Sequence, residues 1–272
     1  MTKSENKLSN LISESERLKH FWNARYNQFS LQESGIKGLG KKYVHYLYQC
    51  KLEAYLKALK QCNIKTDDFV KILDAGCGQG FFAEQSTRIF PNYDYTGVDI
   101  SDKVISHLKT KYQAYKWVLS NFCDPNFYIG EKFDIIQSIE VLHLIVNDTN
   151  HFNAMKNLSK CLSAHGTLII TDVLPVKRKA VSDYMVFRPL SYYEKICSEL
   201  NLKISKIFPM YYWLPDRGSR IPPIKYLFYL FPSYFIYSLD RLFLNLKLPQ
   251  IFPSHDAAMK MLIIKKRTDH EH

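Results

Sequence analysis

The chain has 272 residues, a length that fits one large domain or one domain with a cap. Apolar residues make up 46% of the sequence and charged residues 23%, which excludes a disordered, collagenous or low-complexity chain. The net charge is +11, but the basic residues are spread along the chain with short dense runs at 176–179 and 265–267, so charge alone does not indicate a nucleic-acid surface.

The cysteines and the first residues indicate the compartment. None of the six cysteines forms a CxxC pair, which argues against a zinc ribbon or a disulfide framework, and we expect no metal site. Residues 1–20 contain no continuous apolar run, so they do not resemble a secretory signal. We therefore expect a cytoplasmic, reducing setting.

The N-terminal part of the chain is predicted to be helical. Residues 17–26 mix aromatic and charged side chains as a short amphipathic helix does, and residues 41–62 have apolar side chains at nearly helical period. Between them, Gly35, Gly38 and Gly40 mark a loop that suits closure over a site. We assign residues 1–64 to an N-terminal helical cap or lid, and residues 65–272 to the main domain.

The middle of the chain alternates between strand and helix patterns. Strands are predicted at 70–76, 93–100, 115–122, 133–139 and 166–174, and helices at 81–90, 102–112 and 150–162. This alternation is typical of an α/β fold with a parallel sheet covered by helices on both faces. After Pro175 we expect a helix at 189–202, a strand at 203–213 and a closing strand at 259–267.

Residues 211–257 form an insert rich in aromatic residues and proline before the last strand. Its longest uncharged stretch, 226–239, has 14 residues, whereas a transmembrane helix needs ~20. Three interpretations remain open for this insert: the wall of an apolar pocket or core, a peripheral membrane contact through 221–248, or a partner-binding element.

The most specific motif is Asp74-Ala75-Gly76-Cys77-Gly78-Gln79-Gly80, placed between a strand and a helix. Glycines let the backbone turn sharply and approach a ligand, and ligands of open α/β sheets bind at this edge. Asp99 ends the next strand, where an acid can accept the hydroxyls of a ribose. Asp74 would repel a pyrophosphate but suits an ammonium and a sulfonium, which favours S-adenosylmethionine over a dinucleotide.

This motif resembles motif I of the class I S-adenosylmethionine-dependent methyltransferases, of the small-molecule type similar to methyltransferase domains 11 or 25. The resemblance continues through VDIS (98–101), LSNF (119–122), FDIIQSIEVLHLI (133–145) and GTLIITDVL (166–174). It implies a doubly wound, Rossmann-like, seven-stranded sheet whose last strand is antiparallel.

Residue roles carry over from the resemblance by position. It implies cofactor contacts at the methionine end, the ribose and the adenine for Asp74, Gly76, Gly78, Asp99, Ile100, Asn121, Phe122 and Ser138. Asn121 stands where the family often has an acid, but its amide can still hydrogen-bond the edge of the adenine. The alternative is that Asn121 is only a turn residue. Trp22, Arg25 and Tyr26 resemble a segment that covers the cofactor, and Arg25 or Tyr26 could reach its carboxylate.

His143 matches a histidine of the family and is the candidate general base, although its apolar surroundings also fit a core histidine. Glu140, Asp172 and Tyr184 are weaker candidates for the same role. The fourth strand is not followed by an NPPY-like run, which disfavours amine acceptors of DNA or glutamine. The sequence therefore predicts O- or C-methylation of a small, hydrophobic or lipid-like acceptor.

Two other classes of function stay open. The first is an RNA-directed methyltransferase, although no appended nucleic-acid module is visible and nucleic acid is an unlikely partner for diffuse basic residues. The second is a non-catalytic protein that acts through its aromatic insert at a membrane or a partner. A dinucleotide oxidoreductase is a more distant third interpretation.

Overall fold

The computed structural model describes residues 15–26, 40–62, 64, 67–211 and 259–267, together with single residues between 235 and 242. Gly35, Gly38 and most of the aromatic insert lie outside the described residues. The predicted roles of that insert, including membrane contact through 221–248, therefore stay predictions.

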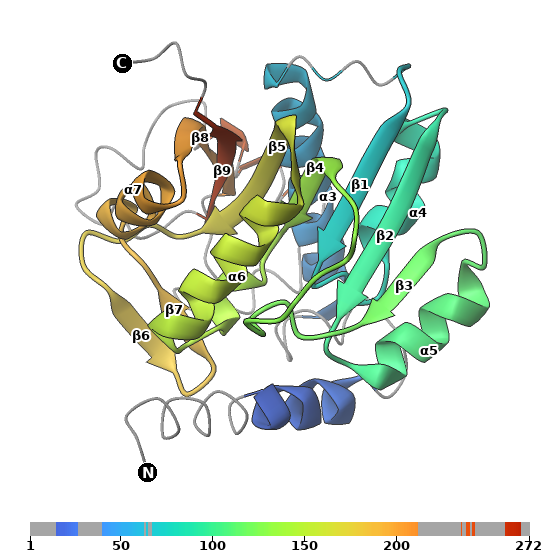
Figure 1. Ribbon diagram of the computed structural model, residues 1–272, viewed down its shortest axis with the longest axis horizontal. Coiled ribbons are helices and arrows are strands. Elements are labelled where there is room, and N and C mark those ends of the chain that lie inside the picture. Colours follow the sequence, from blue (N-terminus) through green and yellow to red (C-terminus); the bar gives the residue numbers. More distant parts are fainter. Residues whose placement is uncertain are drawn as a thin grey trace.

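A seven-stranded sheet forms the centre of the molecule, in the order β3-β2-β1-β4-β5-β9-β8 (Figure 1). Strands β1 to β5 run parallel, and β9 is antiparallel to both β5 and β8. This order confirms the doubly wound sheet with an antiparallel last strand. The strands are β1 Val70–Ala75, β2 Tyr93–Asp99, β3 Lys116–Leu119, β4 Phe133–Ser138, β5 Leu162–Asp172, β8 Leu202–Tyr211 and β9 Met259–Lys266.

Both faces of the sheet are apolar. Successive side chains of a strand point to opposite faces, so consecutive apolar residues are buried on the two sides of the sheet. Ile135 and Ile169 belong to one buried cluster, whereas their neighbours Ile136 and Ile170 belong to another. The first cluster is completed by helices α3 Gly40–Gln61, α4 Phe81–Ile89 and α5 Asp102–Lys111. The second is completed by α6 Asp148–Cys161 and α7 Leu190–Glu199.

Helix α3 belongs to the core of the domain. Tyr46 and Tyr55 of this helix are fully buried in the first apolar cluster, together with residues of β8 and β9. The predicted boundary between a cap at 1–64 and a main domain at 65–272 stays a prediction, and the described part of that cap includes a helix packed on the sheet.

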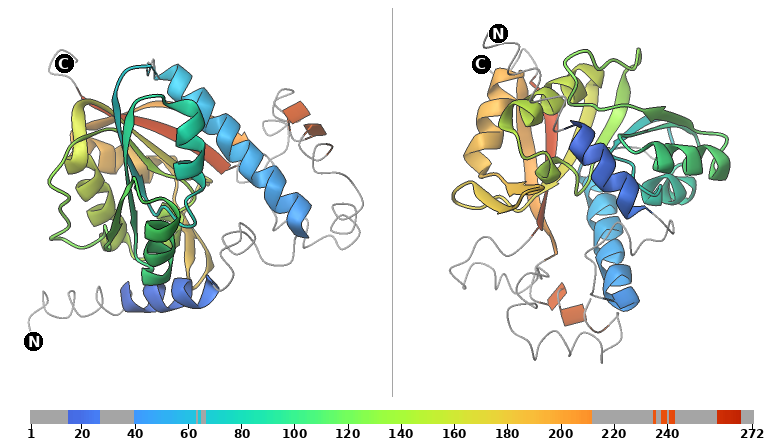
Figure 2. Two further views of the ribbon diagram at one scale, coloured as in Figure 1. Left: turned by 90° about the vertical axis from the view of Figure 1, so that its right-hand side faces the viewer. Right: turned by 90° about the horizontal axis from the view of Figure 1, so that it is seen from below.

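The sequence did not predict the hairpin formed by β6 Lys179–Ser182 and β7 Met185–Phe187. Its tip holds the helical residues 15–25, because Phe21 stacks on Tyr184 with ring centroids 5.1 Å apart and Arg17 donates to the Asp183 carbonyl at 3.1 Å. Figure 2 shows this N-terminal helix lying across the carboxyl ends of the strands. It therefore covers the edge at which the glycine motif lies.

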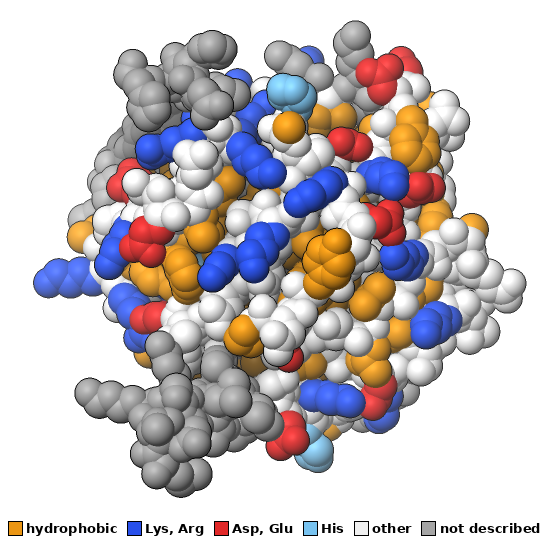
Figure 3. Space-filling view, in the orientation of Figure 1, with side chains coloured by type: hydrophobic (Ala, Val, Ile, Leu, Met, Phe, Trp, Pro, Cys, Tyr) orange, Lys and Arg blue, Asp and Glu red, His pale blue; other side chains and the backbone are white. Residues whose placement is uncertain are grey.

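The surface carries both signs of charge. On the face in Figure 3, Lys and Arg side chains are interspersed with Asp, Glu and apolar side chains. All six cysteines are buried. Within the part of the chain that the structure describes, no helix is both long and apolar enough to cross a membrane.

Candidate active site

The glycine motif forms the turn between β1 and α4. Gly76, Gly78 and Gly80 have φ values of 84°, 49° and 77°, in the left-handed region that favours glycine. A Cβ on Gly76 would lie 2.6 Å from both methyl carbons of Val141. The turn thus needs glycine for its backbone and, at Gly76, also for space.

We expect Gly76→Ala to lower the free energy of unfolding by ~1–3 kcal/mol, because alanine is strained at this positive φ. The clash with Val141 should lower it further. Gly130→Ala is the matched control, because Gly130 has a similar φ of 82° but its Cβ would lie 3.7 Å from the nearest side-chain atom, on Tyr128. Urea unfolding of both variants measures the difference. Equal losses would show that the contact with Val141 costs nothing.

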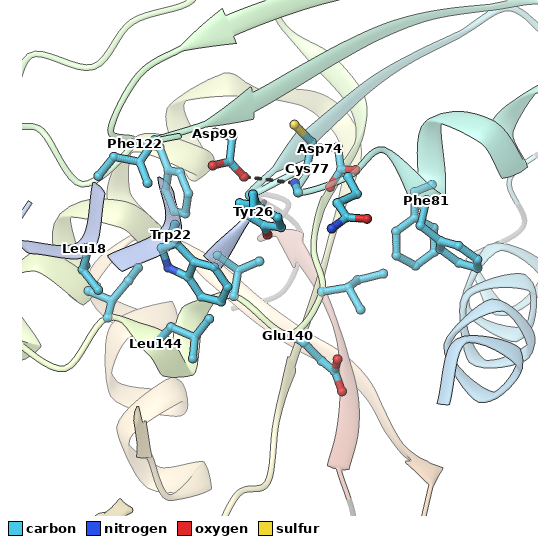
Figure 4. Close-up of a pocket in the computed structure, with 18 of the residues that line it drawn as sticks. Leu18, Trp22, Tyr26, Asp74, Cys77, Phe81, Asp99, Phe122, Glu140 and Leu144 are labelled. Atoms are coloured by element: carbon cyan, nitrogen blue, oxygen red, sulfur yellow. Dashed lines mark hydrogen bonds between the residues drawn. The ribbon is translucent and has the colours of Figure 1, made fainter. Parts of the chain in front are cut away.

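Asp99 lies at the end of β2 and faces a pocket at this edge of the sheet (Figure 4). Its Oδ2 accepts the amide of Gly78 at 3.0 Å and its Oδ1 accepts the amide of Ser101 at 2.9 Å. Burial raises the pKa of this carboxyl. Each carboxylate oxygen can accept more than one hydrogen bond, so Asp99 can hold the turn and still accept a pair of ligand hydroxyls.

Asp74 lies beneath the glycine turn and also lines the pocket. The Tyr95 hydroxyl donates to its Oδ2. Burial, with a further contribution from the charge of Asp99, raises the pKa of Asp74 to about 7. This carboxyl is therefore poised to ionise when a cation binds beside it.

The other side of the pocket is largely apolar. Ile100 and Phe122 line it, and Leu18, Trp22, Leu144 and Ile145 face them from the N-terminal helix and the segment after β4. Asn121 also lines the pocket, accepts the amide of Cys123 at 3.0 Å and donates to Ser15 Oγ at 2.9 Å. It thus serves a turn and anchors the covering helix.

The covering helix brings Tyr26 into the site. Tyr26 is buried, stacks on Trp22 at 5.7 Å and lines the pocket beside Gly78. Asn23 accepts a hydrogen bond from the hydroxyl of Ser101, which ties the helix to the start of α5. Arg25 lies outside the lining, and its guanidinium lies over the rings of Phe21 and Trp22.

Two further predicted residues lie outside the pocket lining. Ser138 is buried and its hydroxyl donates to the Ala75 carbonyl at 2.9 Å, so it holds β4 to β1. His143 lies in the short 3-10 helix η1 Leu142–Leu144, and burial lowers its pKa to about 4. Its ring packs 5.6 Å from that of Phe187, as expected for a core histidine.

The weaker base candidates have other partners. Asp172 is fully buried and accepts the Tyr193 hydroxyl at 2.6 Å, and Tyr184 lies at the hairpin tip against Phe21. Glu140 does line the pocket, where it pairs with Lys51. Sequence reasoning missed Lys51, Tyr48 and Phe81, because nothing in the pattern of α3 distinguishes a lysine that faces a pocket from one that faces solvent.

A family model described as "Methyltransferase domain" matches residues 72–166, from β1 through the glycine turn and Asp99 to β5. Over this segment, the match confirms the predicted resemblance to the class I S-adenosylmethionine-dependent methyltransferases. The malonyl-(acyl-carrier protein) O-methyltransferase of Bacillus cereus is 26% identical over 148 residues, which are 54% of this chain and 50% of that protein. The chain thus spans about half the length of this curated relative.

Solved structures agree with this fold. Magnesium protoporphyrin IX methyltransferase from Synechocystis PCC 6803 with bound SAM has a TM-score of 0.58 at 12% identity, covering 93% of this chain and 97% of that one. The O-methyltransferase of a trans-AT PKS multienzyme of Brevibacillus brevis, in complex with S-adenosyl-L-homocysteine, has a TM-score of 0.55 at 17% identity and covers 85% and 81%.

S-adenosylmethionine is the cofactor of this class, and the described residues suit its chemistry. Asp99 offers a buried carboxylate to a ribose, Asp74 offers one to an ammonium, and Ile100 with Phe122 offers an apolar surface to an adenine. Gly76 and Gly78, which carry no side chains, line the same pocket.

Proposed function

We propose that this methyltransferase transfers the methyl group of S-adenosylmethionine to an oxygen or carbon atom of a small, apolar or lipid-like acceptor. The observation that carries the proposal is the pocket itself, in which two buried acids and a glycine turn stand opposite aromatic walls. Transfer to oxygen is supported by the Bacillus cereus relative and the Brevibacillus protein, which are both O-methyltransferases.

In this proposal Asp99 binds the ribose hydroxyls, Asp74 the amino group, and Ile100, Asn121 and Phe122 surround the adenine. The cofactor supplies a methyl group on a sulfonium, which already carries a good leaving group, so the protein contributes mainly proximity and orientation. Trp22 and Tyr26 exclude water from above. His143 keeps its proposed role as a base only for an acceptor that must lose a proton.

The proposal is tested by calorimetric titration with S-adenosylmethionine and S-adenosylhomocysteine. We expect micromolar binding to the wild type and at least a tenfold loss, ~1.4 kcal/mol, for Asp99→Ala. Asp94→Ala is the control, because Asp94 is an exposed acid at the other end of the same strand. A folded wild type that binds neither compound would refute the proposal and favour a non-catalytic role.

A further inference from the structure

A second polar cluster reaches the pocket through Glu140, which lies away from Asp99 and Asp74 (Figure 4). Lys51 from α3 and Glu140 from the segment after β4 both line the pocket, and Tyr211 at the end of β8 joins them from outside the lining. The Lys51 ammonium pairs with Oε2 of Glu140, and the Tyr211 hydroxyl donates to Oε1 at 2.6 Å. Three elements that are distant in the sequence thus meet at one carboxylate.

The backbone conformation that places Glu140 in this cluster is strained. Its φ is 60°, in the left-handed region where a residue other than glycine is strained by ~1–3 kcal/mol. The Glu140 amide donates to Thr171 Oγ1 at 2.7 Å, which holds the turn to β5. Such strain is maintained where the surroundings fix one geometry, and here that geometry brings the carboxylate to Lys51.

In this cluster Glu140 and Lys51 are both held in their charged forms, and neither is suited to act as a general base. Burial acts to raise the pKa of Glu140, but the Lys51 ammonium and the Tyr211 hydroxyl outweigh it and keep that pKa below its ordinary value. Burial acts to lower the pKa of Lys51, but Glu140 outweighs it and keeps the ammonium charged. A carboxylate with a lowered pKa takes up protons poorly. These side chains therefore suit an acceptor that arrives already ionised.

Lys51 is only 7% exposed, yet it lines the pocket with Tyr48 and Phe81. Its ammonium lies 4.3 Å from the centroid of the Tyr48 ring. An ammonium has three N–H donors, so it can hold Glu140 and a second anion together. The aromatic rings around it offer an apolar surface to the remainder of such a molecule.

We propose that Lys51 binds the methyl acceptor and that this acceptor is a carboxylic acid with an apolar chain, methylated on its carboxylate oxygen. The inference rests on the proposed function and names its substrate class. In such a transfer a C–O bond forms at the carboxylate as the C–S bond breaks, and the electron pair of the C–S bond stays on sulfur. No proton has to leave the acceptor, so the reaction needs no general base.

The test uses straight-chain acids from butanoate to dodecanoate, with their methyl esters and the corresponding amines, titrated calorimetrically into protein loaded with S-adenosylhomocysteine. We expect the best acid to bind at least tenfold more tightly than its ester or amine. Lys51→Met is expected to abolish this preference. Glu140→Gln is expected to tighten acid binding severalfold, because it removes the anion that shares the Lys51 ammonium.

Lys51→Met is expected to weaken acid binding and Glu140→Gln to strengthen it. A general loss of folded structure would weaken binding in both variants, so the two results together distinguish the inference from misfolding. Binding of S-adenosylhomocysteine by each variant, and by the double variant Lys51→Met/Glu140→Gln, reports that the cofactor side is intact. Tighter binding of the amine, or weaker acid binding in Glu140→Gln, would overturn the inference. So would S-adenosylhomocysteine binding to the wild type without binding of any acid. Failure of S-adenosylhomocysteine itself to bind would instead refute the proposed function.

Discussion

Replacing Asp74 with Asn is expected to stabilise the ligand-free protein at pH 8. Burial raises the pKa of Asp74 from 3.8 to about 7, so the folded protein holds this proton more tightly than the unfolded chain does. Stability therefore falls as the pH rises from about 4 to about 7, by at most ~1.4 kcal/mol for each pH unit, and stays reduced above that window. An amide carries no charge to desolvate, and its oxygen can still accept the Tyr95 hydroxyl.

The same substitution is expected to weaken cofactor binding at least tenfold at pH 8, because it removes the anion proposed to hold the amino group. In the wild type, binding of an ammonium beside Asp74 favours the carboxylate. Affinity should therefore rise as the pH increases through about 7, with release of a proton. Asp74→Asn should lose this dependence on pH. Asp74 would then lower the stability of the ligand-free protein and strengthen cofactor binding, which is a trade-off between stability and function.

Urea unfolding from pH 5 to 8 measures the first effect, and the difference between wild type and variant isolates Asp74 from other buried acids such as Asp172. Titration with S-adenosylmethionine in two buffers of different ionisation enthalpy measures the released proton. Asp68→Asn is the control, because the same chemical change is made there on an exposed side chain. A variant less stable than the wild type at pH 8, or one that binds the cofactor equally well, would contradict the prediction.

The sequence predicted what depends on neighbouring residues. The turn through Gly76 and Gly78 and the acid at Asp99 were predictable, because they occupy fixed positions at the ends of β1 and β2. The sheet was predictable for the same reason, since apolar runs such as the one around Ile169 mark strands with both faces covered.

The sequence did not predict what depends on distant residues. Lys51 reaches the pocket because α3 packs beside β8 and directs one polar position towards Glu140, and the period of its apolar residues does not reveal that direction. The β6–β7 hairpin escaped prediction because its strands are very short. It nevertheless carries Tyr184, against which the covering helix packs, and it leads into Arg188, which is fully buried.

Replacing Arg188 with Met is expected to lower the free energy of unfolding and to weaken cofactor binding together. Its guanidinium donates to the Ile145 carbonyl at 2.7 Å and, through Nη2 and Nε, to Asp148 Oδ1 at 2.8 and 3.0 Å. A buried carbonyl left without its donor costs ~1–3 kcal/mol, a loss only partly offset by removing a buried charge. Ile145 and Leu144 line the pocket, so a loosened segment would bind the adenine less well.

Arg178→Met provides a closely matched control for Arg188→Met. Like Arg188, Arg178 donates to a backbone carbonyl, that of Val146 at 3.1 Å, and pairs with Asp148, at 3.3 Å, but its side chain is 46% exposed. Water can replace those interactions, so we expect a change below ~1 kcal/mol. Urea unfolding and titration with S-adenosylhomocysteine measure both effects for each variant.

Similar losses in the two variants would show that burial of Arg188 is irrelevant, whereas a stability loss with unchanged affinity would separate this arginine from the site. The expected result, a joint loss in Arg188→Met alone, would make this arginine the support of the pocket wall formed by Leu144 and Ile145.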